Sequence, residues 1–324
     1  MIRAGILGPT GYAGLEIIQI LLRHPDVELV YLGSRREERP HISQIWPALR
    51  GKLEMQCQRI GEDELPELDV MFLALPHTVA MEHVRLIRDR CKRIIDLSAD
   101  YRLRSATDYE TWYKKAHVDA DNLSRAAYGL SELFAEEIAR ADLIANPGCY
   151  PTAVILAVAP LLIESRIRTD APMIVDAKSG ITGAGRNPKP HLHFPEANES
   201  VTAYRVGTHQ HMGEMLQTMK QLLGKQVELR FVPHLVPMDR GILVTCYAPL
   251  AEPTTTAQLR ESYASTYAAA PFVRVCDEEN IPKTKHVTVT NFTDGGVDQH
   301  GVTAIPSAAI DNVIKSGAGN AVQN

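Results

Sequence analysis

Residues able to perform covalent and acid–base chemistry occur together in the second half of the chain. Cys149 follows an Asn-Pro-Gly turn and begins a long apolar run, so its thiolate would be stabilised by the amide groups at a helix N-terminus. His209 and His211 lie in one polar segment with Glu214, and histidine is the most frequent proton-transfer partner in catalysis. The pattern predicts a nucleophilic cysteine served by one of these imidazoles, with Glu214 orienting a ring or binding substrate.

Structural roles compete with this interpretation. A free cysteine is most often a small buried hydrophobic residue, which is what we expect of Cys57, Cys91, Cys246 and Cys276. Either histidine could be a hydrogen-bonded structural ring. A zinc site at the histidine pair would need a cysteine or a third histidine beside it, and neither is adjacent in the sequence, so we predict no metal.

A glycine-rich turn near the N-terminus has the form that lets bare backbone approach a pyrophosphate on a helix N-terminus. It consists of Gly8, Pro9, Thr10, Gly11, Tyr12, Ala13 and Gly14. An apolar run at 2–7 precedes the turn, and apolar residues at helical spacing follow it from Leu15. This strand–turn–helix context favours a dinucleotide site over a tight turn that binds nothing.

The end of the second predicted strand indicates which dinucleotide is bound. NAD-preferring sites usually place a carboxylate there for the ribose hydroxyl. This chain has Ser34, Arg35 and Arg36 instead, and a hydroxyl with two guanidinium groups could bind a 2′-phosphate. We therefore predict NADP(H). In the alternative interpretation the two arginines only begin the exposed charge run that continues through 37–39.

The elements that must position these groups follow two patterns. Before Cys149, short apolar runs alternate with helical segments such as 79–91. This alternation predicts an α/β domain with a doubly wound parallel sheet and ligands beyond the carboxyl ends of its strands. The strands expected there are 2–7, 27–32, 70–75, 94–97 and 143–145.

After Cys149 the pattern changes to one apolar helix followed by β-rich segments, which predicts a mixed or antiparallel sheet. The helix is expected to end near Glu164, and a glycine-rich polar loop runs from Ser179 to Gly185. Strands are expected at 173–175, within 227–247, at 272–275 and at 286–291. Further helices are expected at 259–269 and 307–314.

Composition narrows the class of protein. The 324 residues are 45% hydrophobic, which suits two domains of ordinary size. A net charge of -5 lacks the basic excess that nucleic acid requires, and no apolar run reaches the roughly 20 residues of a helical membrane span. Cysteines without a C-x-x-C pair indicate reduced thiols. We expect a cytoplasmic protein that acts on a small molecule, without nucleic acid or a membrane as partner.

Six segments together resemble the N-acetyl-gamma-glutamyl-phosphate reductase family, and the resemblance covers essentially the whole chain. They are GPTGYAG from Gly8, LALPHTVA around His77, DLSADYRL from Asp96, ANPGCYPTA around Cys149, DAKSGITGAGR from Asp176 and THQHMGE from Thr208. ANPGCYPTA is the most specific segment, because the related aspartate-semialdehyde dehydrogenases carry a more compact Asn-Cys-Ser or Asn-Cys-Thr motif. The chain departs from the family at Gln210 and Gly213, where arginine and proline are common.

The resemblance implies a fold of two domains. Residues 1–148 would form an NADP-binding Rossmann domain, to which a C-terminal helix at 306–324 returns. Residues 149–305 would form an α+β catalytic and oligomerisation domain like that of glyceraldehyde-3-phosphate dehydrogenase. The assembly would be a homodimer or homotetramer.

The resemblance also implies roles for single residues. Cys149 would be the nucleophile and His209 the general acid and base. The cofactor would contact the glycine turn, the Ser34 segment and also Pro76, His77 and Ser98. Candidates for substrate binding are Arg102, Lys178, Ser179, His211 and Glu214.

The implied reaction is that of a phosphorylating aldehyde dehydrogenase in arginine biosynthesis. N-acetyl-glutamyl 5-phosphate would be reduced with NADPH to N-acetyl-glutamate 5-semialdehyde, with release of phosphate, through a thioester on Cys149. The alternatives are an enzyme like aspartate-semialdehyde dehydrogenase and a reductase of a carrier-linked glutamyl phosphate. A non-catalytic NADPH sensor is an alternative of a different class, and the presence of Cys149, His209 and Glu214 argues against it.

Overall fold

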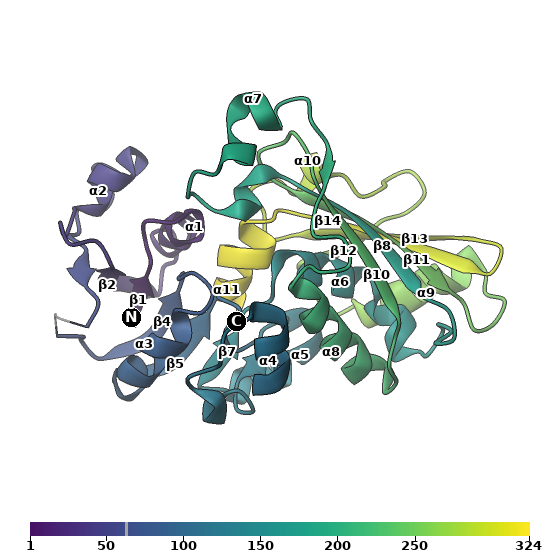
Figure 1. Cartoon of the computed structure of the whole chain (residues 1–324), viewed down its shortest axis with the longest axis horizontal. Helices are drawn as coiled ribbons and strands as arrows, with labels where there is room; N and C mark the ends of the chain where they lie inside the picture. Colours follow the sequence, from purple (N-terminus) through teal and green to yellow (C-terminus); the bar gives the residue numbers. More distant parts are fainter. Residues whose placement is uncertain (62–63) are drawn as a thin grey trace. The chain divides into compact units, whose positions relative to one another are not determined.

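The structure, a computed structural model, describes residues 1–61 and 64–324 and divides the chain into two compact units (Figure 1). Unit 1 contains Met1–Pro147 and Gly317–Asn324, and unit 2 contains Gly148–Ser316. The chain therefore leaves unit 1 directly before Cys149 and returns to it only at Gly317.

Unit 1 is built on a sheet that, within the described residues, has seven strands in the order β3-β2-β1-β4-β5-β7-β6, and each neighbouring pair is parallel. The strands are β1 (Ile2–Leu7), β2 (Val27–Ser34), β3 (Gln58–Arg59), β4 (Leu68–Leu73), β5 (Cys91–Asp96), β6 (Ala127–Tyr128) and β7 (Leu143–Ala145). The predicted parallel α/β sheet is confirmed. Its strand order reverses between β1 and β4, so the carboxyl ends of these two strands form the switch point where such sheets bind ligands.

Helices pack on this sheet through apolar stripes. The helices of unit 1 are α1 (Tyr12–Leu21), α2 (Ile42–Ile45), α3 (Ala80–Ile87), α4 (Ala106–Tyr113), α5 (Ser131–Arg140) and α11 (Gly319–Gln323). Helix α1 buries Ile17 and Ile18 and contacts the C-terminal α11. Asn320 fixes α11, because its Nδ2 donates to Gly129 O at 2.6 Å and to Asn146 Oδ1 at 2.8 Å.

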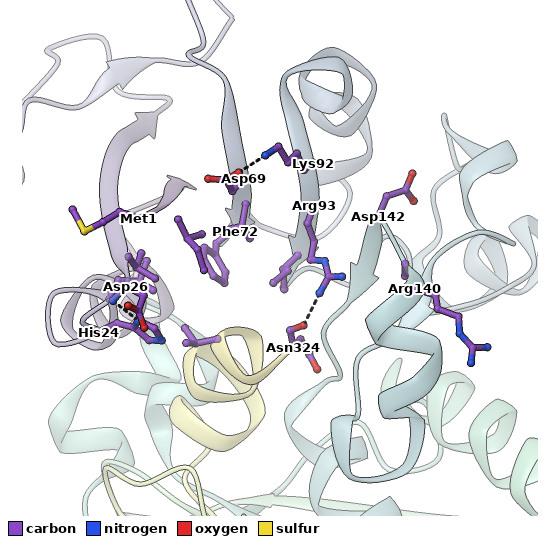
Figure 2. A pocket seen from close by; sticks show the side chains of 17 residues that line it. Met1, His24, Asp26, Asp69, Phe72, Lys92, Arg93, Arg140, Asp142 and Asn324 are labelled. Atoms are coloured by element: carbon purple, nitrogen blue, oxygen red, sulfur yellow. Dashed lines mark hydrogen bonds and ion pairs between the residues drawn. The ribbon is translucent and has the colours of Figure 1, made fainter.

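A cavity of about 820 Å³ opens at the amino ends of the unit 1 strands (Figure 2). Residues from six segments line it, among them Ile2, Val27, Asp69, Arg93, Asp142 and Asn324. On its wall, Lys92 Nζ donates to Asp69 Oδ1 at 2.7 Å, and Arg93 donates to the backbone oxygen of Asn324 at 3.3 Å. The cavity therefore lies at the opposite edge of the sheet from the switch point.

Unit 2 is built on a second sheet, whose seven strands in the described part of the chain follow the order β12-β13-β14-β11-β8-β10-β9. The pairs β8–β10 and β12–β13 are parallel and the other neighbours are antiparallel, which confirms the predicted mixed sheet. The strands are β8 (Met173–Ser179), β9 (Thr202–Ala203), β10 (Leu229–Leu235), β11 (Ile242–Pro249), β12 (Val273–Val275), β13 (Thr293–His300) and β14 (Thr303–Ile310).

Three helices cover one side of the unit 2 sheet in Figure 1: α6 (Cys149–Ile163), α8 (His211–Leu223) and α9 (Thr256–Thr266). The shorter α7 (Phe194–Ala197) and α10 (Thr284–Val287) lie in loops. Burial along β8 agrees with one covered side, because Ala177 and Ser179 are buried whereas Ile174 is exposed and Lys178 half-buried. Among the residues that the structure describes, no helix combines the length and apolarity needed to cross a membrane.

Single helical turns complete the described elements of both units. Turns of 3-10 helix occur at Pro47–Leu49, Arg88–Arg90, Ala120–Asn122, Ile181–Ala184 and Pro190–Leu192, and a π-helical turn at Ile314–Ala318.

The helix predicted at 307–314 is wrong, and with it the first part of the C-terminal helix predicted at 306–324. The first half of 307–314 belongs to β14, which pairs with β11 on one side and β13 on the other. Its alanines favour a helix in isolation, but hydrogen bonding along both edges and complete burial of Ala308 and Ala309 determine a strand.

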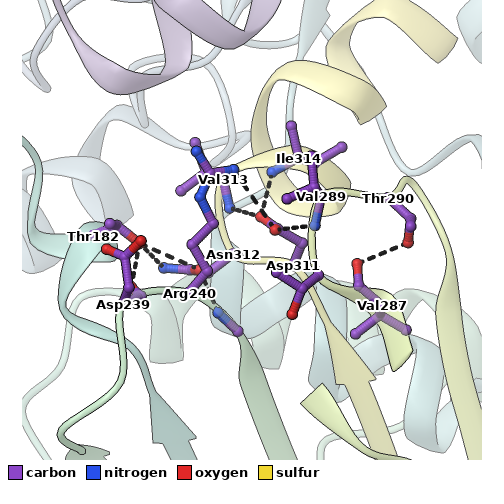
Figure 3. Close-up of polar contacts among 12 residues, drawn as sticks. Thr182, Asp239, Arg240, Val287, Val289, Thr290, Asp311, Asn312, Val313 and Ile314 are labelled. Carbon is purple, nitrogen blue, oxygen red and sulfur yellow. Dashed lines mark hydrogen bonds and ion pairs between the residues drawn. The ribbon is translucent and has the colours of Figure 1, made fainter. Parts of the chain in front are cut away.

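The strand predicted at 286–291 is also wrong. Helix α10 ends at Val287, and Val289 follows in a left-handed backbone conformation with a φ of 60°. Asp311 holds this turn, since its Oδ2 accepts from the Val289 amide at 2.8 Å while its Oδ1 accepts from the amides of Val313 at 2.8 Å and Ile314 at 2.9 Å (Figure 3). The Val289 amide is therefore satisfied by a side chain and not by a neighbouring strand.

Candidate active site

Cys149 is the first residue of α6, and a buried carboxylate holds the turn before it. Gly148 is the extended N-cap of the helix, and its amide donates to Glu214 Oε1 at 2.8 Å. Glu214 is fully buried in the first turn of α8. Thr152 Oγ1 donates to Gly148 O at 2.9 Å and closes the first turn of α6. The partly exposed thiol therefore lies at a rigid helix N-terminus, where the helix dipole favours a thiolate.

The imidazole of His209 packs against the residue that follows the nucleophile Cys149 in the sequence. Its ring centroid lies 5.4 Å from that of Tyr150, the residue after Cys149. The other rings around it belong to Tyr204 at 5.7 Å, His211 at 4.8 Å and Phe231 at 5.6 Å. The buried His209 accepts a hydrogen bond at Nδ1 from the amide of His211 at 3.2 Å. A neutral His209 therefore carries its proton on Nε2, which can donate to a reacting oxygen.

A pair of tyrosines borders the same site, and the sequence interpretation missed it. The hydroxyl oxygens of Tyr150 and Tyr204 are 2.9 Å apart. Burial raises the pKa of Tyr204 to about 12, and the nearby Cys149 contributes to this increase. Burial also raises the pKa of Tyr150. Both phenols are therefore protonated donors at neutral pH. Tyr204 belongs to no recognisable motif beyond its place five residues before His209.

The other four thiols differ from Cys149 in their surroundings. Cys57 and Cys246 are buried as predicted, whereas Cys91 and Cys276 are partly exposed. Burial raises the pKa of Cys57 to about 11, of Cys91 to about 12 and of Cys276 to about 11, and it raises the pKa of Cys246 as well. These groups therefore remain thiols at neutral pH. Residues 1–61 and 64–324 contain no cluster of three or more side chains suited to a metal ion.

Ser179 and Lys178 lie at the end of β8 but on opposite faces of the sheet. Ser179 is buried on the helix-covered face, and its Oγ donates to Gly180 O at 3.0 Å. Lys178 lies on the other face, with its Nζ 2.7 Å from Asp176 Oδ2. The structure therefore places Ser179, and not Lys178, on the face that α6 covers. His211 is buried as the first residue of α8.

An amide side chain and backbone hydrogen bonds hold the loop after Ser179. Asn312 Nδ2 donates to Thr182 Oγ1 at 3.1 Å, and Asn312 Oδ1 accepts from the Gly241 amide at 2.7 Å (Figure 3). The Thr182 amide also donates to Asp239 O at 3.1 Å. The glycine-rich loop is thus anchored at one end of the unit 2 sheet.

In unit 1 the glycine turn has the backbone that a pyrophosphate requires. Gly8 has a φ of 86°, and a Cβ at this position would lie 2.3 Å from Ala74 O. A Cβ on Gly14 would lie 2.5 Å from Gly8 O, so neither glycine can be replaced without displacement. Helix α1 begins at Tyr12 after the N-cap Gly11, at the carboxyl end of β1. The turn therefore fits a dinucleotide at the switch point. Sequence reasoning missed Trp46, whose Nε1 donates to Pro9 O at 3.0 Å.

The predicted 2′-phosphate residues lie at the carboxyl end of β2. Ser34 is the last residue of the strand and is buried, and its Oγ accepts from the Arg36 amide at 3.2 Å. Arg35 and Arg36 follow it and are exposed. The three residues stand where a doubly wound sheet receives the adenosine ribose.

Two further predicted cofactor residues, Pro76 and His77, are exposed beyond the carboxyl end of β4. Ser98 differs, because it is fully buried and its Oγ donates to Asp96 Oδ2 at 2.7 Å. Burial, assisted by the neighbouring Asp100 carboxylate, raises the pKa of Asp96 to about 7. The Ser98 side chain therefore belongs to a buried polar network.

Arg102, predicted as a substrate ligand, is also buried in unit 1. Its Nε donates to Asn146 O at 2.7 Å and its Nη2 to Leu97 O at 2.9 Å. These bonds join the ends of β5 and β7, so the guanidinium of Arg102 stabilises the fold of unit 1.

Two family models match the chain. The semialdehyde dehydrogenase NAD binding domain covers residues 3–141, and the semialdehyde dehydrogenase dimerisation domain covers residues 149–312. Aspartate semialdehyde dehydrogenase II of Vibrio cholerae, complexed with ASA, has a TM-score of 0.74 at 14% identity, over 100% of this chain and 96% of that chain. Aspartate semialdehyde dehydrogenase with NADP from Candida albicans has a TM-score of 0.73 at 14% identity, over 99% and 96%. The fold and the matched domains define a semialdehyde dehydrogenase.

Sequence relatives narrow this class. N-acetyl-gamma-glutamyl-phosphate reductase of Alkaliphilus metalliredigens is 43% identical over 327 residues, which span 100% of this chain and 94% of the relative. The protein of the same name from Desulforudis audaxviator is 44% identical over 330 residues, with the same coverage. The chain belongs to the N-acetyl-gamma-glutamyl-phosphate reductase family. The predicted family, fold, enzyme class and nicotinamide cofactor are confirmed, and the main predicted activity is supported over the aspartate-semialdehyde alternative.

Proposed function

We propose that this chain reduces N-acetyl-glutamyl 5-phosphate to N-acetyl-glutamate 5-semialdehyde with NADPH, a step of arginine biosynthesis, and that Cys149 carries the acyl group as a thioester. The observation that supports this most is the fixed turn before the nucleophile, where Gly148 donates to the buried Glu214. A buried imidazole, His209, packs beside the same turn. A thiol fixed in this way at a helix N-terminus suits covalent catalysis.

In the first step the Cys149 thiolate attacks the acyl carbon of the substrate. A carbon–sulfur bond forms, the bond from the acyl carbon to the phosphate oxygen breaks, and phosphate leaves with that electron pair. The amides at the start of α6 stabilise the thiolate before the attack. Backbone donors near the turn would stabilise the charge that develops on the acyl oxygen.

A bound NADPH supplies the hydride that the thioester carbon accepts. His209 donates from Nε2 to the oxygen on this carbon, and in the reverse direction it removes the proton from that oxygen. His209 then takes this proton back as the carbon–sulfur bond breaks, so that the oxygen becomes the carbonyl oxygen of the aldehyde and the bonding electron pair returns to Cys149 as the thiolate. The sequence of steps removes the phosphate before the hydride arrives.

The remaining unit 2 residues divide by what they contact. Glu214 is a positioning residue for Cys149, because its carboxylate accepts from the Gly148 amide. Ser179 and His211 are proposed to contact the acyl group from the helix-covered face. Lys178 stays a prediction as a substrate ligand, since its Nζ is paired with Asp176. Arg102 of unit 1 also stays a prediction as a substrate ligand, since its guanidinium is bonded to backbone oxygens.

The proposed cofactor site in unit 1 has three parts. The glycine turn would contact the pyrophosphate, the end of β2 the 2′-phosphate, and the end of β4 the remainder of the dinucleotide. The residues are Gly8, Thr10, Gly11, Tyr12, Ala13, Gly14, Ser34, Arg35, Arg36, Pro76, His77 and Ser98. Accessible positions after parallel strands support the assignment, except for Gly14, Ser34 and Ser98, which are buried.

We also propose that the chain forms a homodimer or homotetramer in the cytoplasm through the uncovered face of the unit 2 sheet. Ile174 and Tyr247 are paired in register on that face and are 43% and 40% exposed. The family model for residues 149–312 is a dimerisation domain, which supports an oligomer. Charged substitution of Ile174 and Tyr247 should convert the assembly to smaller species in sedimentation equilibrium.

The activity is tested by following the absorbance of reduced cofactor with N-acetyl-glutamate semialdehyde, phosphate and NADP. The same assay is run with aspartate semialdehyde. The proposal expects phosphate-dependent reduction with the acetylated substrate, and mass spectrometry of the quenched forward reaction should show the acyl group on Cys149. Turnover only with aspartate semialdehyde would identify an enzyme like aspartate-semialdehyde dehydrogenase. Turnover only with a carrier-linked substrate would identify a reductase of carrier-linked glutamyl phosphate. Tight NADPH binding without turnover would indicate a sensor.

A further inference from the structure

The turn that follows β4 contains a strained residue. Thr78 has a φ of 69°, in the left-handed region that β-branched side chains avoid. The turn lies beside the glycine turn, since a Cβ on Gly8 would meet Ala74 O at 2.3 Å. Pro76 and His77 are exposed between these two points. A strained backbone at the switch point persists only if the surrounding contacts fix it, so these contacts identify what the strain serves.

Two side chains hydrogen-bond to the backbone of Thr78. Its amide donates to Asp100 Oδ1 at 2.6 Å, and its carbonyl accepts from Lys115 Nζ at 2.8 Å. The second oxygen of the same carboxylate, Asp100 Oδ2, accepts from the Met81 amide at 3.0 Å. One carboxylate thus fixes both the turn and the start of α3.

Asp100 is itself held in place. It is fully buried, Tyr109 OH donates to its Oδ1 at 2.7 Å, and its own amide donates to Ser98 Oγ at 3.1 Å. The neighbouring Ala99 amide donates to His77 Nδ1 at 3.0 Å. The segment after β5 therefore orients two consecutive residues of the turn after β4, although neither Asp100 nor Ala99 is itself at the surface.

We propose that Asp100 is a positioning residue for the dinucleotide: its carboxylate holds Thr78 in the left-handed conformation that presents Pro76 and His77 to the bound cofactor. The inference rests on the proposed NADPH site in unit 1. Asp100 is buried, so it affects the affinity for NADPH through the turn and not by contact with the cofactor.

The experiment measures the Kd of NADPH by the fluorescence of the bound nucleotide, together with kcat and the melting temperature. Asp100→Asn replaces one carboxylate oxygen by a donor that opposes an amide. We expect the Kd to rise by about 10- to 100-fold, the scale of a lost charge-assisted hydrogen bond, with kcat at saturating NADPH within about 3-fold. Tyr109→Phe is the matched control, because it removes a bond to the same oxygen and leaves both amide contacts; its Kd should stay within about 3-fold.

A second substitution separates positioning from general stability. Thr78→Gly removes the cost of the left-handed backbone, so it should restore most of the affinity lost in Asp100→Asn. If the double variant binds NADPH as weakly as Asp100→Asn alone, the proposal is overturned. A merely structural defect would lower the melting temperature in both variants and would not be rescued in Kd.

Lys115→Ala keeps the inference testable if Asp100→Asn does not fold, since Lys115 reaches the same turn from a partly exposed position. It should raise the Kd of NADPH by several-fold. Glu82→Gln is its control, because Glu82 pairs with Lys115 at 3.3 Å without contacting Thr78. Unchanged Kd in Lys115→Ala and in Asp100→Asn would refute the positioning role while leaving the proposed function intact. A wild-type chain that binds no NADPH would instead refute the proposed function.

Discussion

The surroundings of Cys149 and the end of β2 differ most in burial. Near the nucleophile the polar groups are removed from water, since Glu214 is 0% and His209 4% exposed. At the end of β2, Ser34 is buried, and the two arginines that follow it are exposed. One region holds its groups by hydrogen bonds within the protein, and the other offers charges to a ligand that arrives from solvent.

This difference predicts how each region responds to substitution. A buried hydrogen bond is strong, and the loss of one partner leaves the other unsatisfied. Interactions between exposed charges are weakened by water and screened by salt. Substitutions beside Cys149 should therefore lower kcat at any ionic strength. Substitutions at Arg35 and Arg36 should act on cofactor discrimination and should become weaker as salt is added.

The largest effect is expected for Cys149→Ser. A hydroxyl is a much poorer nucleophile than a thiolate near neutral pH, so turnover should fall by on the order of 10⁴-fold or more. NADPH binding should be unchanged, because the glycine turn and β2 belong to unit 1. Steady-state kinetics and nucleotide fluorescence measure the two quantities. Turnover of the serine variant within a few-fold of wild type would rule out the thioester.

Next in size is His209→Asn, which should lower kcat by roughly 10²- to 10⁴-fold, the range of a lost general acid or base. The asparagine oxygen can still accept from the His211 amide, so the loop should keep its conformation. His211→Asn should be milder. Parallel kcat measurements across pH compare the two variants. Small and equal losses would show that both rings only support the loop, and the reverse ranking would reassign the acid to His211.

The sequence was sufficient where a motif and its function are local. The glycine turn, the helix that starts at Cys149 and the parallel sheet all follow from neighbouring residues, and the structure agrees with them. The partners of these motifs are not local. Glu214 was predicted to orient a ring or bind substrate, but its bond to Gly148 joins positions 66 residues apart and depends on the packing of α6 against α8.

The sequence interpretation also missed strand β13 and helix α8, for different physical reasons. Strand β13 contains Gly295 and Gly296 and acidic residues, which have low strand propensity, so only its pairing with β12 and β14 determines it. Helix α8 was not predicted although its signal is present in the sequence. Met212, Met215 and Met219 recur at helical spacing, and Gly224 ends the helix in a left-handed conformation.

Arg35→Ala and Arg36→Ala test the exposed side of the comparison. Each charge-assisted contact to a 2′-phosphate contributes about 1.5–3 kcal/mol, which corresponds to a roughly 10- to 150-fold change in kcat/KM for NADPH. The kcat/KM for NADH should change little. The ratio of the two, measured at low and high salt, checks both the contact and its screening. An unchanged ratio in both variants would show that the arginines belong only to the exposed charge run and do not contact the 2′-phosphate.

Ser34→Ala should give the smallest effect of the series. The hydroxyl is neutral and accepts from the Arg36 amide at 3.2 Å, so its removal costs one ordinary hydrogen bond of about 0.5–1.5 kcal/mol. We expect a roughly 2- to 10-fold loss in kcat/KM for NADPH that does not depend on salt, because no charge is removed. Ser34→Thr retains the hydroxyl and is the matched control. A loss of the same size with NADH would mean that Ser34 supports the backbone at the end of β2 and does not contact the phosphate, whereas a loss confined to NADPH would show that even the buried member of this region is part of phosphate recognition.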